Sequence, residues 1–355
     1  MNKTKRHQKG FSLIEIMVAL VISLILLSGL IEVYLGNKQS YNLIEESSRM
    51  QENGRFAIDI MTREIRGADF WGCLRKPSEQ NPPKLFNNLN VTAGNAAQYD
   101  IGEAITGVDG GGTNPDSISF GGAYGKGINI TREMTQEAAV VMVNANNGLD
   151  QNDIIILSDC EKGDIFQINN ANPDSSGTIV HNTGAVSDGP GNKATANCTG
   201  PGANPHCLSK TYDTDAQIYE VRRIGYAIRP SLFTGINGLV RIGNDGTATE
   251  IIDNVVNMQI LYGEDTDLDI NNIPNQYVTA TQIGYVDNAN PGRIGEAITV
   301  RIALLLRSER DLLPANTIQN HQLLDVNVAT NDRRAYQTFA TTITIRNRAI
   351  NDAPP

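Results

Sequence analysis

The sequence predicts an α+β protein in which one long N-terminal helix packs on an antiparallel β-sheet that carries loop-rich β insertions. A predominantly apolar run extends from Phe11 to Ile31. No proline occurs before Pro77, so nothing forces the helix to end with that run. After Gly67 the sequence changes to short β-like runs separated by turn residues. With 355 residues, the chain can also bury a sizeable core.

The apolar run is predicted to span a membrane. It holds fourteen Phe, Leu, Ile or Val residues and a single charge, Glu15. About 20 apolar residues cross the roughly 30 Å of a bilayer as a helix. At about −0.3 to −0.6 kcal/mol each, the fourteen side chains contribute roughly −4 to −8 kcal/mol to insertion. We therefore assign residues 11–35 to a transmembrane half of the helix.

The charges that flank the span predict its orientation. Four basic residues and no acidic residue precede it, namely Lys3, Lys5, Arg6 and Lys9. Because positive segments stay in the cytoplasm, the N-terminus is predicted to be cytoplasmic and the rest of the chain periplasmic. The net charge of −10 becomes −14 when the four positive charges of residues 1–10 are removed. A domain this acidic is not expected to bind nucleic acid.

The second half of the helix, residues 36–66, is predicted to be amphipathic and to lie on the sheet. Its charged face carries pairs at i,i+4 spacing, such as Asp59 and Arg63. Gly54 is expected to be a point of close packing. A helix from Ser12 to Arg66 would be roughly 80 Å long at about 1.5 Å per residue. The apolar stripe is expected to contain Tyr41, Ile44, Ser48, Ile58, Met61 and Ile65.

Residues 67–355 are predicted to form a β-rich domain. In the clearest strands, residues 298–306 and 339–345, apolar side chains alternate onto one buried face. Residues 250–258 are interpreted as a short helix that leads into a strand ending at Tyr262. Residues 106–127 and 169–206, rich in Gly, Asn and Pro, are interpreted as long surface loops or insertions. Further strands are predicted at residues 117–120, 139–143, 153–158, 165–168, 217–229 and 239–242.

The four cysteines, Cys73, Cys160, Cys198 and Cys207, all lie in this exported part. An even number of cysteines in an oxidising compartment predicts two disulfides, and four cysteines allow three pairings. A Cys73–Cys160 bridge would tie the end of the helix to the sheet. A Cys198–Cys207 bridge would then close the glycine-rich insertion. The other two pairings stay open at this point.

The order of features at the N-terminus differs from that of a secretory signal, in which the cleavage site follows the apolar stretch. Here Lys-Gly and then Phe-Ser-Leu-Ile-Glu precede it. This arrangement resembles the type IV prepilin family, which implies a leader at residues 1–10, cleavage after Gly10, and methylation of Phe11 as the new N-terminus. The less specific alternative is a simple signal anchor.

Glu15 is the feature that favours the prepilin interpretation. A carboxylate inside a span costs roughly 2.5–3.5 kcal/mol on insertion scales, so an intramembrane acid is expected to have a function. Its natural partner is the α-amine of Phe11 on a neighbouring subunit. Such a pair would neutralise both charges in a low dielectric and set the register of helices in a filament.

Later segments resemble the PilW group of minor pilins; they are Arg66-Gly67-Ala68, Trp71-Gly72-Cys73, Ser158-Asp159-Cys160, Ile260-Leu261-Tyr262-Gly263, Arg333-Arg334 and Arg346-Asn347-Arg348. The resemblance implies a pilin-like fold and a subunit that initiates or assembles a type IV pilus (fimbrium) from the bacterial inner membrane. The implied partners are other minor pilins, the major pilin, the prepilin peptidase, the inner-membrane assembly platform and a tip adhesin. The alternatives are a type II secretion pseudopilin, an adhesin that uses residues 169–206, and a membrane-anchored periplasmic enzyme or binding protein.

One acidic loop has the spacing of a metal site. Oxygen ligands at Asp265, Asp267, Asp269 and Asn271 occupy positions 1, 3, 5 and 7, as at the start of a Ca²⁺ loop. Ile270 stands where such a loop has its turn-making glycine, and Gln276 replaces the bidentate glutamate. We therefore prefer a solvated acidic turn and keep calcium as a candidate cofactor.

Enzyme motifs are absent from the sequence. There is no Gly-x-Ser-x-Gly, no His-Glu-x-x-His and no Walker A sequence, and the histidines are scattered. The glycine-rich residues 121–127 lack a Ser or Thr after Lys126 and are interpreted as a flexible turn. We therefore predict that the chain is a non-enzymatic subunit without a catalytic cofactor.

Overall fold

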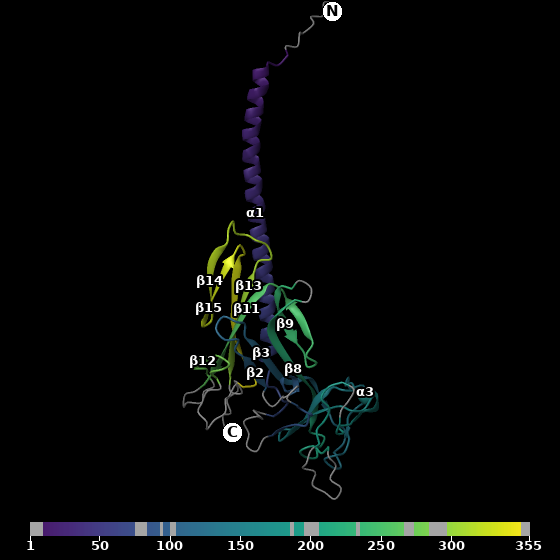
Figure 1. Cartoon of the computed structure of the whole chain (residues 1–355). Coiled ribbons are helices and arrows are strands. Elements are labelled where there is room, and N and C mark those ends of the chain that lie inside the picture. Colours follow the sequence, from purple (N-terminus) through teal and green to yellow (C-terminus); the bar gives the residue numbers. More distant parts are fainter. Residues whose placement is uncertain are drawn as a thin grey trace, which may run out of the picture.

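The computed structural model describes residues 10–74, 84–92, 95–99, 104–184, 188–194, 206–231, 235–265, 273–283 and 297–348. One helix, α1 (Leu13–Arg66), extends far beyond a β-rich domain, and only its second half lies against that domain (Figure 1). The helix is continuous over 54 residues, as the absence of proline predicted. The chain is therefore an α+β protein with a protruding N-terminal helix.

The strands form two main sheets. The larger sheet follows the order β1 (Leu85–Asn87), β6 (Gly163–Gln167), β5 (Ile154–Ser158), β8 (Gln217–Pro230), β3 (Ser117–Asn129) and β2 (Ile105–Val108), and β9 (Asn237–Ile242) and β10 (Ala248–Ile252) extend it from β8. The smaller sheet has the order β12 (Gln276–Val278), β11 (Val255–Glu264), β13 (Thr299–Arg307) and β16 (Tyr336–Thr344). Only the β1–β6 pairing among the described strands is parallel.

Shorter elements complete the domain. Two-stranded ladders join β14 (Thr317–Leu323) to β15 (Val326–Asp332), and β4 (Val141–Met142) to β7 (Thr178–Ile179). Two single-turn helices, α2 (Ala96–Tyr99) and α3 (Pro173–Ser176), lie in the connections. The β14–β15 hairpin covers the outer face of β13, where Ala303 and Leu305 are fully buried. Strand β13 is thus buried on both faces, and not only on the one face that alternation predicted.

The main core forms where α1 meets both sheets. Ala57, Met61 and Ile65 on the helix are fully buried in one cluster with side chains from the smaller sheet and from β2, β3, β8, β9 and β10 of the larger sheet. Glu64 strengthens this contact, because its carboxylate accepts a hydrogen bond from the Tyr226 hydroxyl at 2.5 Å and pairs with Arg241 at 3.0 Å. The second half of α1 is therefore a structural part of the domain.

The buried stripe of α1 differs from the predicted one. Tyr41 and Ile44 are exposed, at 67% and 66%. The stripe that packs on the sheets contains Glu46, Met50, Gly54, Ala57, Met61 and Ile65. Its spacing of three or four residues is that of one helix face. The stripe begins with Glu46, which apolar periodicity does not identify because its side chain is charged.

The prediction that residues 106–127 form a loop, with a flexible turn at 121–127, is wrong for most of the segment: only residues 109–116 form a loop, and the predicted strand at 117–120 lies within β3. This segment contains the last part of β2 and most of β3, and a bulge lies between Tyr124 and Ile128. Gly122 is needed because the chain that follows α1 pairs closely with β3. A Cβ atom on Gly122 would lie 3.2 Å from the backbone nitrogen and oxygen of Phe70. Close backbone approach, and not flexibility, explains the glycine at position 122.

The short helix predicted at residues 250–258 is also absent. The segment belongs to β10 and β11, which are separated by a turn at Asn254 with a φ of 56°. Most of β11 is buried on both faces, so its sequence lacks the alternation that identifies a strand. Residues 169–206 are mainly loop where they are described, with α3, β7 and isolated bridges as their ordered elements.

Candidate functional site

The exposed start of α1 holds the residues predicted to be processed. Gly10 and Phe11 precede the helix, and Phe11 is 84% exposed. Ser12 caps the helix, since its hydroxyl accepts a hydrogen bond from the Glu15 backbone N–H at 3.3 Å. The Glu15 carboxylate in turn accepts the Ser12 backbone N–H at 2.9 Å. This capping box satisfies two backbone donors that would otherwise be unpaired in an apolar medium.

The capping box was missed in the sequence, although Ser-x-x-Glu before an apolar run is its signature. It gives Glu15 a partner within its own chain. The structure does not test the predicted pairing of this carboxylate with the Phe11 amine of a neighbouring subunit.

The first half of α1 presents apolar side chains on all sides. No residue in its most apolar 18-residue window is buried within the chain. A solvent-exposed helix of this composition would be unfavourable in water. The helix therefore has the length and composition of a membrane span, and it is free to contact lipid or other helices.

A polar cluster holds α1 where the helix leaves the domain. Glu46 is 1% exposed, and its Oε2 accepts the backbone N–H groups of Glu309 at 2.7 Å and Arg310 at 3.4 Å. The Arg310 guanidinium also pairs with Glu45 at 3.1 Å. Donors to a buried carboxylate offset its desolvation, so the segment between β13 and β14 is fastened to the helix.

The other end of α1 meets the closing segment of the chain. Arg66-Gly67-Ala68 ends the helix, and Arg346-Asn347-Arg348 follows β16. The Arg346 N–H donates to the Arg66 carbonyl at 3.3 Å. The Asn347 amide donates to the carbonyls of Ala68 at 2.8 Å and Gly67 at 3.4 Å. Carbonyls at the helix end are thus satisfied by a segment some 280 residues away in sequence.

A buried ion pair reinforces this junction. Arg348 Nε lies 2.6 Å from Asp69 Oδ2, and both side chains are at most 5% exposed. The second oxygen of Asp69 accepts the Trp71 indole N–H at 2.7 Å. Two of the segments that resemble PilW sequences, 66–68 and 346–348, therefore meet at the base of α1 and form one structural unit.

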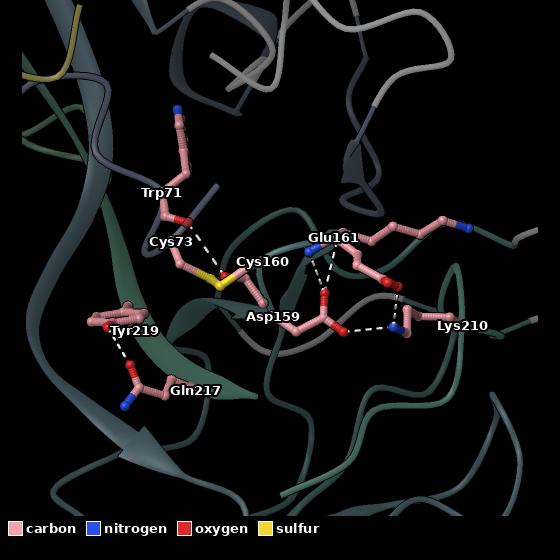
Figure 2. Close-up of a disulfide and its surroundings, with 10 residues drawn as sticks. Trp71, Cys73, Asp159, Cys160, Glu161, Lys210, Gln217 and Tyr219 are labelled. Carbon is pink, nitrogen blue, oxygen red and sulfur yellow. Dashed lines mark hydrogen bonds and ion pairs between the residues drawn. A yellow bond between two sulfur atoms is a disulfide. The ribbon is translucent and has the colours of Figure 1, made fainter. Parts of the chain in front are cut away.

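The expected bridge between Cys73 and Cys160 is present. It joins the chain just after α1 to the turn between β5 and β6, across 87 residues of sequence (Figure 2). Asp159 orders this turn, because its carboxylate accepts the backbone N–H groups of Glu161 and Lys162. Lys210 pairs with Asp159 at 2.6 Å, and Figure 2 shows this contact beside the disulfide.

The remaining predicted sites lie partly outside the described residues. Cys207 is disulfide-bonded, but Cys198 falls outside, so the Cys198–Cys207 bridge stays a prediction. Of the candidate calcium ligands, only Asp265 is described; Asp267, Asp269 and Asn271 are not. Across the described ranges, no group of three or more His, Cys, Asp or Glu side chains could hold a metal ion.

The side chains of His181 and His321 make contacts within the packed β structure. His181 is buried, its ring nitrogen Nε2 lies 3.0 Å from the carbonyl oxygen of Ala139, and its ring packs against Phe166. Burial lowers the pKa of His181 below its ordinary value. His321 contacts the hydroxyl of Thr330 on the neighbouring strand. These contacts explain the two side chains as parts of packed β structure.

Comparison with protein families adds two matches. Residues 218–347 match the PilW family, described as type IV pilus-assembly protein W. Residues 5–31 match the prokaryotic N-terminal methylation motif. The first match runs from β8 to the segment that closes the base of α1, and the second covers the start of the helix. No curated protein and no solved structure matches the chain.

Proposed function

We propose that this chain, a membrane-anchored type IV pilus minor pilin of the PilW family, acts in the initiation or assembly of the pilus. The observation that carries the proposal is the methylation motif, matched over residues 5–31, at the start of a continuous helix whose first half is wholly exposed. A subunit built in this way joins a filament by packing its helix against those of its neighbours.

In the proposed mechanism, a prepilin peptidase removes residues 1–10 and leaves Phe11 as a methylated N-terminus. The new amine pairs with Glu15 of an adjacent subunit, so that neither charge is left unpaired in a low dielectric. The exported domain lies in the periplasm and contacts other minor pilins, the major pilin and the assembly platform. None of these steps requires a catalytic residue in the chain.

The PilW match favours this role over that of a type II secretion pseudopilin, which shares only the N-terminal features. The match includes β11, β13 and β16, the strands against which α1 packs. The adhesin alternative rests on residues 169–206, which lie outside both matched segments.

The test is mass spectrometry of the N-terminal peptide, from sheared surface filaments and from membranes separately. We expect a peptide that begins at methylated Phe11 in both fractions. The same peptide in membranes alone would support a pseudopilin or a cell-bound initiator. An intact Met1 leader in both fractions would overturn the proposal.

A further inference from the structure

A groove lies at the base of α1. It has a volume of about 540 Å³ and opens between the last two turns of the helix, the bulge of β3 and the closing segment of the chain. Phe70 and Tyr124 give the groove an apolar part, and Arg66 and Arg346 line it as well. Part of its lining belongs to the hydrogen-bonded junction between residues 66–68 and 346–348.

Arg66 and Arg346 carry charge that no described residue neutralises. Both are exposed, and their side chains make no hydrogen bond or ion pair among the described residues. Arg63 also lines the groove but is paired with Asp59 at 2.5 Å. The described lining thus has three arginines against one carboxylate. This excess of positive charge stands out on a chain whose net charge is −10.

The chemistry of the groove favours a carboxylate-bearing peptide. A guanidinium forms bidentate hydrogen bonds with a carboxylate, and the apolar part of the groove suits the aliphatic carbons of a bound segment. Single-stranded nucleic acid would need a track of cations and stacked aromatic rings along its backbone. Two unpaired arginines beside Asp59 do not form such a track. The described groove therefore fits an acidic protein segment.

We infer that this basic groove binds an acidic segment on the exported domain of a sibling pilin in the filament. The inference rests on the proposed function and adds a contact surface to it. Acidic domains repel one another, and a positive groove on one of them gives a neighbour a specific place to dock. The groove is lined by the last two turns of α1. These turns lie at the opposite end of the helix from the apolar span (Figure 1), so this contact is distinct from helix packing.

Photocrosslinking of the full chain in its own host tests the inference. A photoreactive phenylalanine analogue replaces Phe70, which lines the groove, and the crosslinked peptide is sequenced from sheared filaments. We expect a peptide rich in Asp or Glu from another pilin. Raising the salt from about 50 mM to about 500 mM during crosslinking should reduce the yield several-fold.

Charge variants show whether the arginines hold the partner. The double variant Arg66→Glu, Arg346→Glu should lower the crosslink yield at least about tenfold, and Arg66→Gln, Arg346→Gln should lower it less. Arg132→Glu is the matched control, because Arg132 is an exposed arginine outside the groove, and it should leave the yield unchanged. Formation of the Cys73–Cys160 bridge in each variant verifies folding.

The inference would be overturned by crosslinks to DNA, to lipid, to a second copy of this chain or to residues 349–355 of the same chain. It would also be overturned if no crosslink formed, or if the crosslink yield were the same in both double arginine variants as in the unaltered chain. The methylated Phe11 peptide, measured in the same filaments, separates the two proposals. If it is present while the groove makes no contact, the pilin role stands and the groove inference fails. If it is absent, the proposed function fails, and with it the inference.

Discussion

Gly54 illustrates how a single residue sets the distance between α1 and the smaller sheet. The ring of Phe339, on β16, lies directly over the helix backbone at this point. A Cβ atom built on Gly54 would lie 2.4 Å from a ring carbon. Glycine costs an exposed helix up to about 1 kcal/mol relative to alanine. Its presence here is explained by the close approach of the ring.

Gly54→Ala should therefore destabilise the protein by about 1–3 kcal/mol, because overpacking outweighs the gain in helix propensity. Gly36→Ala is the control, since a Cβ atom there meets nothing within 4 Å and should be neutral or slightly stabilising. Thermal unfolding of the full chain in detergent measures both. Adding Phe339→Leu should restore part of the loss, and equal melting temperatures for the two alanine variants would contradict the packing argument.

His181 predicts a dependence of stability on pH. Burial is the main cause of its lowered pKa, and the neighbouring His206, whose ring centroid lies 5.7 Å away, adds to the effect. In the unfolded chain the imidazole titrates near its ordinary value of about 6.5. The folded state thus binds fewer protons than the unfolded state as pH falls below this value. Stability is fully present above it and decreases on acidification.

Denaturant unfolding between about pH 7.5 and about pH 5.5 should show this loss, with a slope of at most about 1.4 kcal/mol per pH unit from this one group. His181→Gln should be less stable at the higher pH, and its stability should change less with pH. His206→Gln keeps the buried ring and should retain most of the slope. A His181→Gln profile parallel to that of the unaltered chain would rule out this histidine as the cause.

At the scale of elements, the disulfide fixes the base of α1 to the larger sheet. Closing a loop of 87 residues stabilises the folded state by about 4–5 kcal/mol in the chain-entropy account. Replacing Cys73 and Cys160 together by serine should remove most of this free energy in equilibrium denaturation. The pair Cys198→Ser, Cys207→Ser, which would open a much shorter loop, should cost only about 2–3 kcal/mol. Equal losses would indicate a different pairing.

An element could be predicted from the sequence where its cause is a local property of that sequence. Both ends of α1 were predictable, because apolar composition and the absence of proline are local properties. Segments 106–127 and 250–258 were not, because burial on both faces and close backbone contact remove the alternation of a strand. The candidate site divides in the same way. Gly10, Phe11 and Glu15 lie within six residues of one another in sequence, whereas the contacts of Glu46 and of Arg66 depend on partners more than 260 residues away.

At the scale of the whole molecule, the two halves of α1 differ in what surrounds them. The second half is locked into the domain by the core, by Glu46 and Glu64, and by the disulfide beyond its end. The first half has no partner within the described chain, and its apolar side chains need lipid or neighbouring helices. Because α1 is continuous, its two halves are joined without a break, and Glu15 lies near the free end of the helix.

Substitution of Glu15 therefore tests filament assembly separately from membrane insertion. Glu15→Ala should leave membrane insertion intact, because the fourteen apolar side chains remain. It should reduce incorporation into filaments at least about tenfold, because a neighbour's amine loses its counter-charge in a low dielectric. Quantitative mass spectrometry of the chain in filaments relative to membranes measures this ratio.

Two further variants separate the charge of Glu15 from its role in the helix cap. Glu15→Gln keeps a side chain that can accept the Ser12 N–H but removes the charge, so it should fail to assemble as Glu15→Ala does. Ser12→Ala removes the capping hydroxyl at a cost of about 1 kcal/mol and should assemble nearly normally. If Glu15→Gln assembled normally and Ser12→Ala did not, the cap would be the essential feature, and the pairing of Glu15 with a neighbour's amine would be wrong.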